Sequence, residues 1–164
     1  MTVTDFSLQL PGEPEDIDFD YDLPPGPFVH SRSVGWSDTD PAQIVFTGQV
    51  PGMALDAYEA WLKAVIGVNW YELNLDHSVG MPFVHLSCDF KSPITPRSKL
   101  LLPVFVEKIG RSSLSMRVEG HQDERFCFTS SLISTFVRSR ALKTIPIPTN
   151  IRANIERYQS RQDG

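Results

Sequence analysis

Residues 51–67 of the chain read PGMALDAYEAWLKAVIG. Apolar side chains recur there at intervals of three and four residues, namely at Ala54, Ala57, Tyr58, Trp61, Leu62 and Val65. That period predicts a helix with a broad apolar face. Pro51 suits the first turn, where its missing N–H would have had no partner, and Gly67 suits the position just past the end. A helix with so wide an apolar face needs a sheet to cover it.

Segments rich in β-branched and aromatic residues flank this helix, and turn-like residues separate them. The predicted strands are Val29–Trp36, Met81–Lys91, Leu100–Lys108, Ser112–Gly120 and Arg125–Arg138. Short connections join the last four, which predicts an antiparallel meander. A short amphipathic helix over Asn150–Gln159 follows. We therefore expect an α+β fold in which an antiparallel sheet of about five strands wraps around one long central helix.

The chain has 164 residues, of which 41% are hydrophobic, so it is long enough for one domain with an ordinary core. Seven acids precede the first basic residue, Arg32: Asp5, Glu13, Glu15, Asp16, Asp18, Asp20 and Asp22. Without them, 13 of the 20 acids remain against 15 lysines and arginines, which argues against a general nucleic-acid binder. We expect an acidic, proline-rich leader over residues 1–27, docked in part through Phe19, Tyr21 and Leu23. Residues 28–164 are expected to form the folded domain.

Several features bear on the compartment. The longest apolar runs, such as Leu100–Val106, are too short to cross a bilayer, and this one contains Pro103. The first residues lack the basic and apolar regions of a secretory signal. Cys88 and Cys127 lie far apart in strand-like segments, which is typical of reduced, packed thiols. We expect a cytoplasmic protein that does not enter the membrane.

Residues 34–46, VGWSDTDPAQIVF, place acids on the connection between the first strand and the long helix. The first N–H groups of a helix have no partner within it, and the helix dipole makes that end electropositive. A thioester carbonyl lodged there would be polarised and its developing oxyanion stabilised. A nearby carboxylate could attack the carbonyl carbon or activate a water molecule. Because thiolate is a good leaving group, the arrangement suits thioester hydrolysis.

The run Asp38-Thr39-Asp40-Pro41-Ala42, followed by Ile44-Val45-Phe46 and a helix, resembles the signature of the 4-hydroxybenzoyl-CoA thioesterase family. The resemblance extends over residues 29–140 and includes Phe90-Lys91-Ser92-Pro93 and Glu107-Lys108-Ile109-Gly110-Arg111-Ser112-Ser113. It implies a hotdog fold, hydrolysis of acyl-CoA thioesters, and a homodimer or homotetramer with active sites at the subunit interface. It implies no metal or other cofactor, since coenzyme A is part of the substrate.

By this resemblance, Asp40 is the catalytic nucleophile or general base, and a backbone N–H near Thr47 stabilises the oxyanion. Asp40 could instead only stabilise its own turn, because Asp-Thr-Asp-Pro is common in turns. Asp38 suits a structural role in the same loop. The chain departs from the family at Gln43, where glycine is usual, and at Thr47-Gly48-Gln49, where an aromatic residue and asparagine are usual. Pro51-Gly52 also indicates a shifted or lengthened helix start. These departures bear on the acyl group, which the resemblance gives as small or aromatic.

Two helix acids, Asp56 and Glu59, are the main alternative to Asp40. They lie one turn apart and either stabilise the helix dipole or reach the acyl pocket. The aromatic residues Trp36, Trp61, Trp70 and Phe46 are interpreted as core, although Trp61 or Phe46 could also line an acyl pocket.

The turn after Gly110 carries Arg111, Ser112 and Ser113. The resemblance implies that this turn meets the nucleotide and phosphates of coenzyme A, and the planar fork of arginine suits phosphate. A solvated turn charge is the alternative. Weaker candidates for the same role are Lys91, Arg97, Lys99, Arg138 and Lys143.

Two other functions remain open. The altered loop is compatible with a non-catalytic hotdog protein that binds acyl-CoA or another apolar ligand. A hydratase ranks last, because such enzymes pair a histidine with an acid in the loop and helix, and no histidine falls between Val34 and Asn69. The four histidines show no metal-like spacing, and an Asp38-x-Asp40 metal site lacks further ligands. No G-x-S-x-G elbow is present, which argues against an α/β serine hydrolase.

Overall fold

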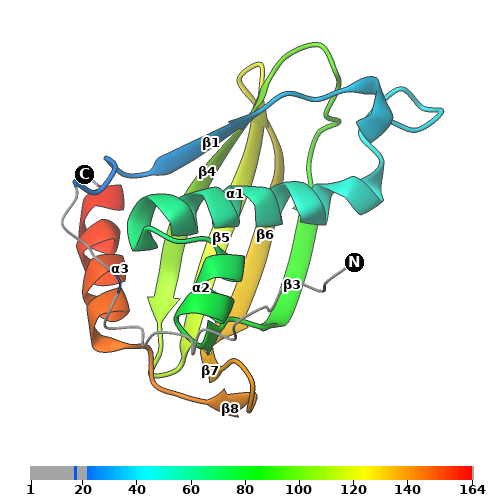
Figure 1. Cartoon of the computed structure of the whole chain (residues 1–164). Coiled ribbons are helices and arrows are strands. Elements are labelled where there is room, and N and C mark those ends of the chain that lie inside the picture. The colour runs from blue at the N-terminus through cyan, green and yellow to red at the C-terminus, as the bar shows by residue number, and fades with distance from the viewer. Residues whose placement is uncertain (1–16, 18–21, 164) are drawn as a thin grey trace, which may run out of the picture.

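The computed structural model describes Ile17 and residues 22–163 (Figure 1). Its helices are α1 (Val50–Ile66), α2 (Trp70–Asp76) and α3 (Thr149–Gln162), with 3-10 turns at Trp36–Asp38 and Thr47–Gln49. The main sheet contains β1 (Phe28–Arg32), β3 (Phe83–Phe90), β4 (Leu100–Ile109), β5 (Ser113–Gln122) and β6 (Arg125–Thr135). A small sheet contains β2 (Val79–Gly80), β7 (Val137–Arg138) and β8 (Lys143–Thr144).

Helix α1 is the long central helix that the sequence predicts. Pro51 lies in its first turn, and Gly67 closes it with φ 88°, a left-handed conformation that glycine adopts without steric strain. Its buried face carries Val50, Met53, Ala54, Ala57, Tyr58, Trp61, Leu62, Val65 and Ile66. This face packs on the main sheet, whose strands alternate buried and half-exposed residues most regularly along β5. The predicted antiparallel sheet of five strands around one central helix is confirmed.

The order of the strands corrects the predicted meander. The sheet runs β1-β4-β5-β6-β3, so β3 pairs with β6 and not with its chain neighbour β4. The reason is that β1 and β5 occupy both edges of β4, so β3 cannot pair with β4 and pairs with the free edge of β6. The connection over residues 91–99 is long enough to cross between the two edges. Within the described residues, no strand pairs with the outer edge of β3.

Helix α3 covers the part of the β4 edge that β1 leaves unpaired. Strand β1 pairs only with residues 100–104 of β4, so the rest of that edge has no neighbouring strand among the described residues. The side chain of Gln162 accepts a hydrogen bond from Val106 N–H (2.9 Å) and donates one to Val106 C=O (2.8 Å). The buried Tyr158 hydroxyl accepts from Phe28 N–H (2.8 Å) and donates to Val104 C=O (2.6 Å). The edge of β4 is therefore satisfied by side chains where it lacks a neighbouring strand.

Replacing Tyr158 with phenylalanine is expected to lower the free energy of unfolding by about 1–3 kcal/mol, because two buried backbone groups lose their partner. Urea unfolding of the variant measures the loss. Tyr71→Phe, at an exposed position on α2, is the matched control and should be neutral. Equal stability of Tyr158→Phe and the unaltered protein would contradict this role of the hydroxyl.

Three local predictions were wrong or incomplete. The first strand ends at Arg32, and Trp36 is an exposed residue of a 3-10 turn, because Asp38 accepts the Gly35 N–H (2.9 Å) and turns the chain out of the sheet. Helix α2 was missed, although its capping box joins Asn69 and Glu72. Trp61 is fully buried as predicted, and Trp70 packs against the core but is only half-buried.

The predicted leader lies mostly outside the described residues, including Phe19 and Tyr21. Within it, Leu23 is buried as predicted, and Ile17, which the prediction did not include, is buried too. Both cysteines are free, and burial raises the pKa of the Cys127 thiol. Among the described residues, no helix combines the length and the hydropathy needed to cross a membrane.

Candidate functional site

The acidic loop before α1 folds back on itself like a small hairpin. Thr39 and Val45 form an isolated antiparallel bridge, and Asp40 N–H donates to Ile44 C=O (3.1 Å). Asp40 Oδ1 accepts the N–H of Ala42 (2.8 Å), which is an Asx turn. The carboxylate is half-buried, and none of the described residues donates a hydrogen bond to its Oδ2. The hydrogen bond to Oδ1 thus orients the carboxylate of Asp40, while Oδ2 has no hydrogen-bond donor among the described residues.

Arg32, at the end of β1, ties this loop to the helix. Its Nη2 lies 3.0 Å from Asp38 Oδ1, and its Nη1 lies 3.5 Å from Asp56 Oδ2. The side chain of Asp38 is only 13% exposed, and its backbone C=O accepts from Phe46 N–H (2.9 Å). Asp38 therefore holds the loop in place, as its predicted structural role requires. No sequence pattern indicates the role of Arg32, because its partners are six and 24 residues away in the chain.

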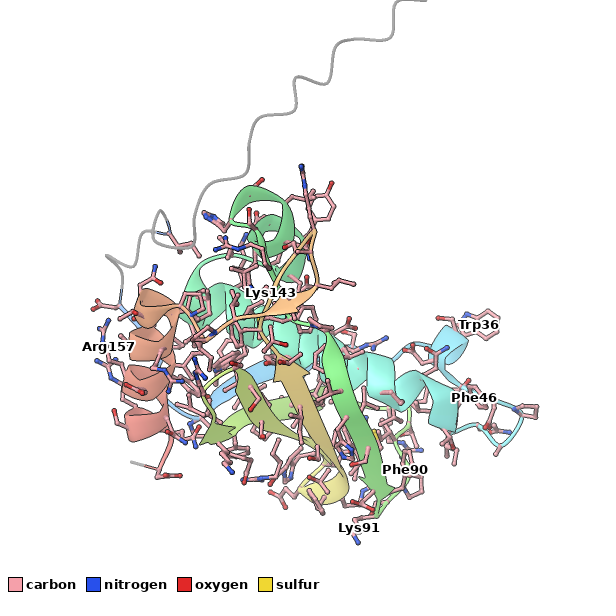
Figure 2. The ribbon with its side chains drawn as sticks, turned by 90° about the horizontal axis from the view of Figure 1, so that it is seen from below. Trp36, Phe46, Phe90, Lys91, Lys143 and Arg157 are labelled. Carbon is pink, nitrogen blue, oxygen red and sulfur yellow. The ribbon has the colours of Figure 1, made fainter. Side chains whose placement is uncertain are left out.

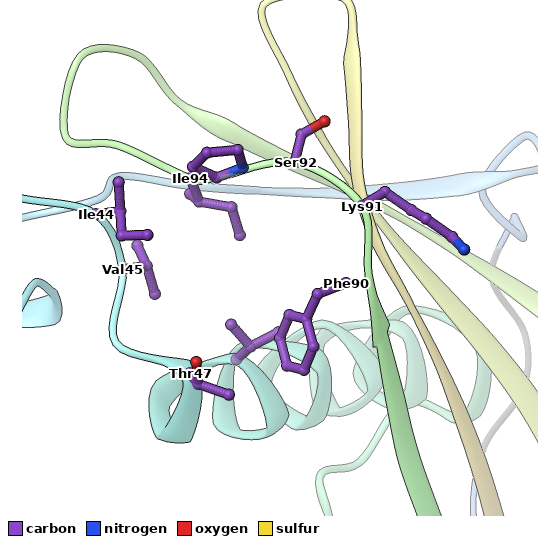
Figure 3. A pocket seen from close by; sticks show the side chains of 9 residues that line it. Ile44, Val45, Thr47, Phe90, Lys91, Ser92 and Ile94 are labelled. Atoms are coloured by element: carbon purple, nitrogen blue, oxygen red, sulfur yellow. The ribbon is translucent and has the colours of Figure 1, made fainter. Parts of the chain in front are cut away.

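A cavity of about 260 Å³ opens between this loop, the start of α1 and the end of β3 (Figure 3). Its lining consists of Ile44, Val45, Thr47, Val50, Phe90, Lys91, Ser92, Pro93 and Ile94. Most of these side chains are apolar, whereas that of Lys91 extends away from the enclosed space. Asp40 does not line the cavity itself, but its hydrogen-bond partner Ile44 does. The cavity can therefore accept an apolar group beside the Asp40 loop.

The start of the helix faces this cavity. The first hydrogen bond of the 3-10 turn runs from Gln49 N–H to Phe46 C=O (2.9 Å), so the N–H groups of Thr47 and Gly48 precede it. Such leading N–H groups, together with the helix dipole, form an electropositive end. Thr47 lines the cavity (Figure 3), which places this end where a carbonyl oxygen could be polarised.

Phe46 lies on the other side of the loop. Its ring is 52% exposed and packs so closely on Gly48 that a Cβ there would lie 2.5 Å from a ring carbon. The prediction that Phe46 is a core residue was wrong, and Phe46 is not among the residues that line the cavity. Gly48, which stands where the family usually has another residue, permits this packing.

Gln43 adopts φ 64°, a left-handed conformation that favours glycine. Its N–H donates to Asp40 C=O (2.9 Å), so it closes the tight turn that holds the carboxylate. The loop therefore keeps a backbone that suits glycine and adds an exposed amide side chain.

Gln43→Gly is expected to raise the free energy of unfolding by about 0.5–1 kcal/mol, because relief of the left-handed strain exceeds the entropy that glycine adds to the unfolded chain. Thermal unfolding checks this, with Gln49→Gly in the 3-10 turn as a control that should not stabilise. A lower melting temperature for Gln43→Gly than for the unaltered protein would contradict the strain.

The structure places Asp56 and Glu59 elsewhere. They line a second cavity, of about 560 Å³, between β1 and α1, together with His30, Arg32, Ala60, Lys63 and Asn69. Trp61, on the buried face of α1, contacts the rings of Tyr58 and Tyr158 in the core. The structure of the chain does not bring these predicted substrate-binding residues together with Thr47.

Arg111, Ser112 and Ser113 lie at the other end of the sheet from Asp40. On β6, Phe128 pairs with Phe90 beside the cavity, whereas Thr135 pairs with Ser113. Seven residues of strand separate these two pairs, which corresponds to about 23 Å. Arg111 is exposed, and its C=O accepts from Ile147 N–H (2.9 Å). Within this chain, the turn at Arg111 and the Asp40 loop are too far apart to hold the same small group. Among the described residues, no cluster of three or more His, Cys, Asp or Glu side chains could hold a metal ion.

Known proteins with related sequences and folds include several thioesterases. The 1,4-dihydroxy-2-naphthoyl-CoA hydrolase of Nostoc punctiforme is 35% identical over 92 residues, which cover 56% of this chain and 62% of that protein. The matches to two further hydrolases of that name, from Picosynechococcus and Synechocystis, span 54% and 55% of their lengths. The match thus spans less than two thirds of each of these relatives.

Two solved structures show the same fold. A thioesterase superfamily protein from Jannaschia sp. CCS1 is 40% identical, with a TM-score of 0.78 over 84% of this chain and 96% of that one. A 1,4-dihydroxy-2-naphthoyl-CoA thioesterase from Synechocystis is 24% identical, with a TM-score of 0.71 over 78% and 94% of the two chains. The model of the thioesterase-like superfamily matches residues 34–155. The chain therefore belongs to the thioesterase-like superfamily and has its hotdog fold.

Proposed function

We propose that this protein hydrolyses the thioester of a small or aromatic acyl-CoA, with Asp40 at the reaction centre. One observation carries the proposal: the 3-10 turn that leads into α1 lines an apolar cavity through Thr47, beside a loop that presents a carboxylate oxygen without a hydrogen-bond partner among the described residues. Membership of the superfamily supports it, and so do relatives named as acyl-CoA hydrolases. No metal or other cofactor is needed for this chemistry, because the leaving group is a thiolate.

Two routes are compatible with the geometry. In the first, Asp40 attacks the carbonyl carbon, the C–S bond breaks, coenzyme A leaves as a thiolate, and water then hydrolyses the mixed anhydride. In the second, the oxygen of a water molecule attacks the carbonyl carbon while Asp40 accepts a proton from that water. The C–S bond then breaks, and coenzyme A again leaves as a thiolate. In both, the oxygen of the carbonyl gains negative charge beside the N–H groups of Thr47 and Gly48.

We further propose that the protein forms a homodimer through β3. The outer edge of this strand has no neighbour among the described residues, and Val84, Leu86 and Phe90 along it are exposed apolar residues. An unpaired edge is a template for another strand, and a two-fold axis pairs identical strands antiparallel. Such a dimer would bring the opposite end of the partner's sheet to the Asp40 site. The partner's Arg111 turn would then lie at the same end as Asp40, where it could meet the phosphates of coenzyme A.

The test is the release of free thiol from a panel of short, long-chain and aromatic acyl-CoAs. Because the cavity is small and apolar, we expect turnover of short or aromatic thioesters and far less turnover of long-chain ones. Binding without turnover across the whole panel would instead favour a non-catalytic acyl-CoA-binding protein. A preference for long acyl chains would contradict the assignment of this cavity to the acyl group.

A further inference from the structure

Two groups of exposed apolar side chains lie at opposite ends of β3. The first, here called the loop tip, is residues 36–46, where Trp36 is 85% exposed and Phe46 is 52% exposed. The second, here called the hairpin patch, is formed by α2 and residues 137–144, where Tyr71 is 73% and Leu142 is 72% exposed. Large apolar residues that cluster on a surface mark an interaction site. Both groups are therefore candidate interaction surfaces.

The hairpin patch contains a hollow that suits an aromatic side chain. A cavity of about 280 Å³ is lined there by Trp70, Asn74, Gly80, Met81, Pro82, Val137, Ser139 and Leu142. The indole N–H of Trp70 is buried, and none of the described residues accepts a hydrogen bond from it. The hollow is thus mainly apolar, with one polar group left unsatisfied.

The positions of the two groups fit a second copy of this chain. The loop tip projects beyond the start of α1 at one end of β3, whereas α2, β7 and β8 lie at the other end (Figure 1). From below, Trp36 and Phe46 lie together on the projecting loop, well away from Lys143 of the hairpin patch (Figure 2). When two copies of β3 pair antiparallel, the end of β3 in one protomer lies beside the start of β3 in the other. The loop tip of each protomer then faces the hairpin patch of its partner. This step rests on the dimer in the proposed function.

Asp40 and residues 137–144 carry charges of opposite sign. The loop tip has two acids, of which Asp38 is already paired with Arg32 of its own chain, so Asp40 is the acid left for a partner. In the hairpin patch, residues 137–144 carry three basic residues and no acid, whereas α2 carries Glu72, which is paired with Lys63, and Asp76. Complementary potentials across an interface steer association and fix its register.

We propose that the loop tip of each protomer docks on the hairpin patch of its partner, with Trp36 seated at the hollow beside Leu142. Docking covers the Asp40 loop with a second protomer, so each site is completed by the partner's α2 and β7–β8 hairpin. A tryptophan that enters a pocket at the centre of a contact is typical of residues that dominate binding.

Cysteine cross-linking tests this arrangement. In the full-length double variant Ser37→Cys/Ala141→Cys, which leaves Trp36 and Leu142 in place, a short bismaleimide linker is expected to move most chains to the mass of a dimer on a denaturing gel. The matched control is Ser37→Cys/Leu101→Cys, because Leu101 is an exposed residue between the buried residues of β4 and so lies on the face of the sheet away from α1. Each single variant measures the background from Cys88 and Cys127.

Sedimentation of the same samples separates the two ways of failing. A dimer that cross-links no more than the control overturns the docking and leaves the β3 pairing intact. A monomer overturns the β3 pairing and the docking with it. The thiol-release assay reports on thioester hydrolysis separately from both results.

Discussion

Asp40→Asn is expected to lower kcat for thioester hydrolysis by roughly 10²–10⁴-fold, the usual contribution of a positioned acid or base. The amide oxygen of asparagine can still accept the Ala42 N–H, so the turn should keep its shape. The amide cannot act as a strong nucleophile or accept a proton from water. The loss should therefore fall on kcat, with little change in KM or in the free energy of unfolding. Initial rates over a range of acyl-CoA concentrations separate these terms.

Binding provides the control for this prediction. The cavity, the start of α1 and the loop backbone do not depend on the charge of Asp40, so an acyl-CoA should bind to the variant with unchanged affinity. Calorimetric titration with a poorly hydrolysed acyl-CoA analogue measures this. If Asp40→Asn lost binding and turnover together, its role would be to shape the loop and not to carry the reaction.

Arg32→Leu is expected to lower kcat by roughly 10- to 100-fold, because a small misplacement of a reacting group has effects of this size. The variant leaves the half-buried Asp38 without its cation, and we expect a loss of about 1–3 kcal/mol in the free energy of unfolding. Arg32→Lys keeps the charge, but a single ammonium does not reproduce the fork that reaches both carboxylates. Kinetics and urea unfolding of both variants measure the two effects.

Asp56→Asn is the matched control for Arg32. It removes only the longer contact, at 3.5 Å to a largely exposed carboxylate, and exposed ion pairs contribute about 0–1 kcal/mol. We expect nearly unchanged kcat and stability. Arg32 is a positioning residue if the folded Arg32→Lys protein keeps its KM but loses kcat. If both Arg32 variants lost stability alone, with unchanged kcat, the arginine would serve the fold and not the site.

The helix and the strands could be predicted because their patterns are local. The three- and four-residue spacing in residues 51–67 reports directly on a helix face, and Pro51 and Gly67 mark its ends. Which strands pair is not a local property. Strand β3 lies beside β6 because β1 pairs with one edge of β4, and the residues of β3 themselves do not indicate which strand will be their neighbour.

The site was predictable only in part, for a similar reason. The Asp40 loop and the helix start at Thr47 are neighbours in the chain, so a sequence motif can describe them. Arg32 contacts Asp38 and Asp56 through space, and this clamp appears only once β1 and α1 are side by side. The exposure of Trp36 also depends on the fold, since an indole side chain by itself favours burial.

If the carboxylate of Asp40 carries thioester hydrolysis, its substitution must abolish a reaction that survives the substitution of an acid on α1. The measurement is kcat for thiol release from a saturating aromatic or short acyl-CoA, for the unaltered protein, Asp40→Asn and Glu59→Gln. Glu59 lines the separate cavity between β1 and α1, so its substitution should leave kcat almost unchanged, whereas Asp40→Asn should lose nearly all activity. Full activity in Asp40→Asn, with collapse in Glu59→Gln, would move the reaction to the helix acids and contradict the account.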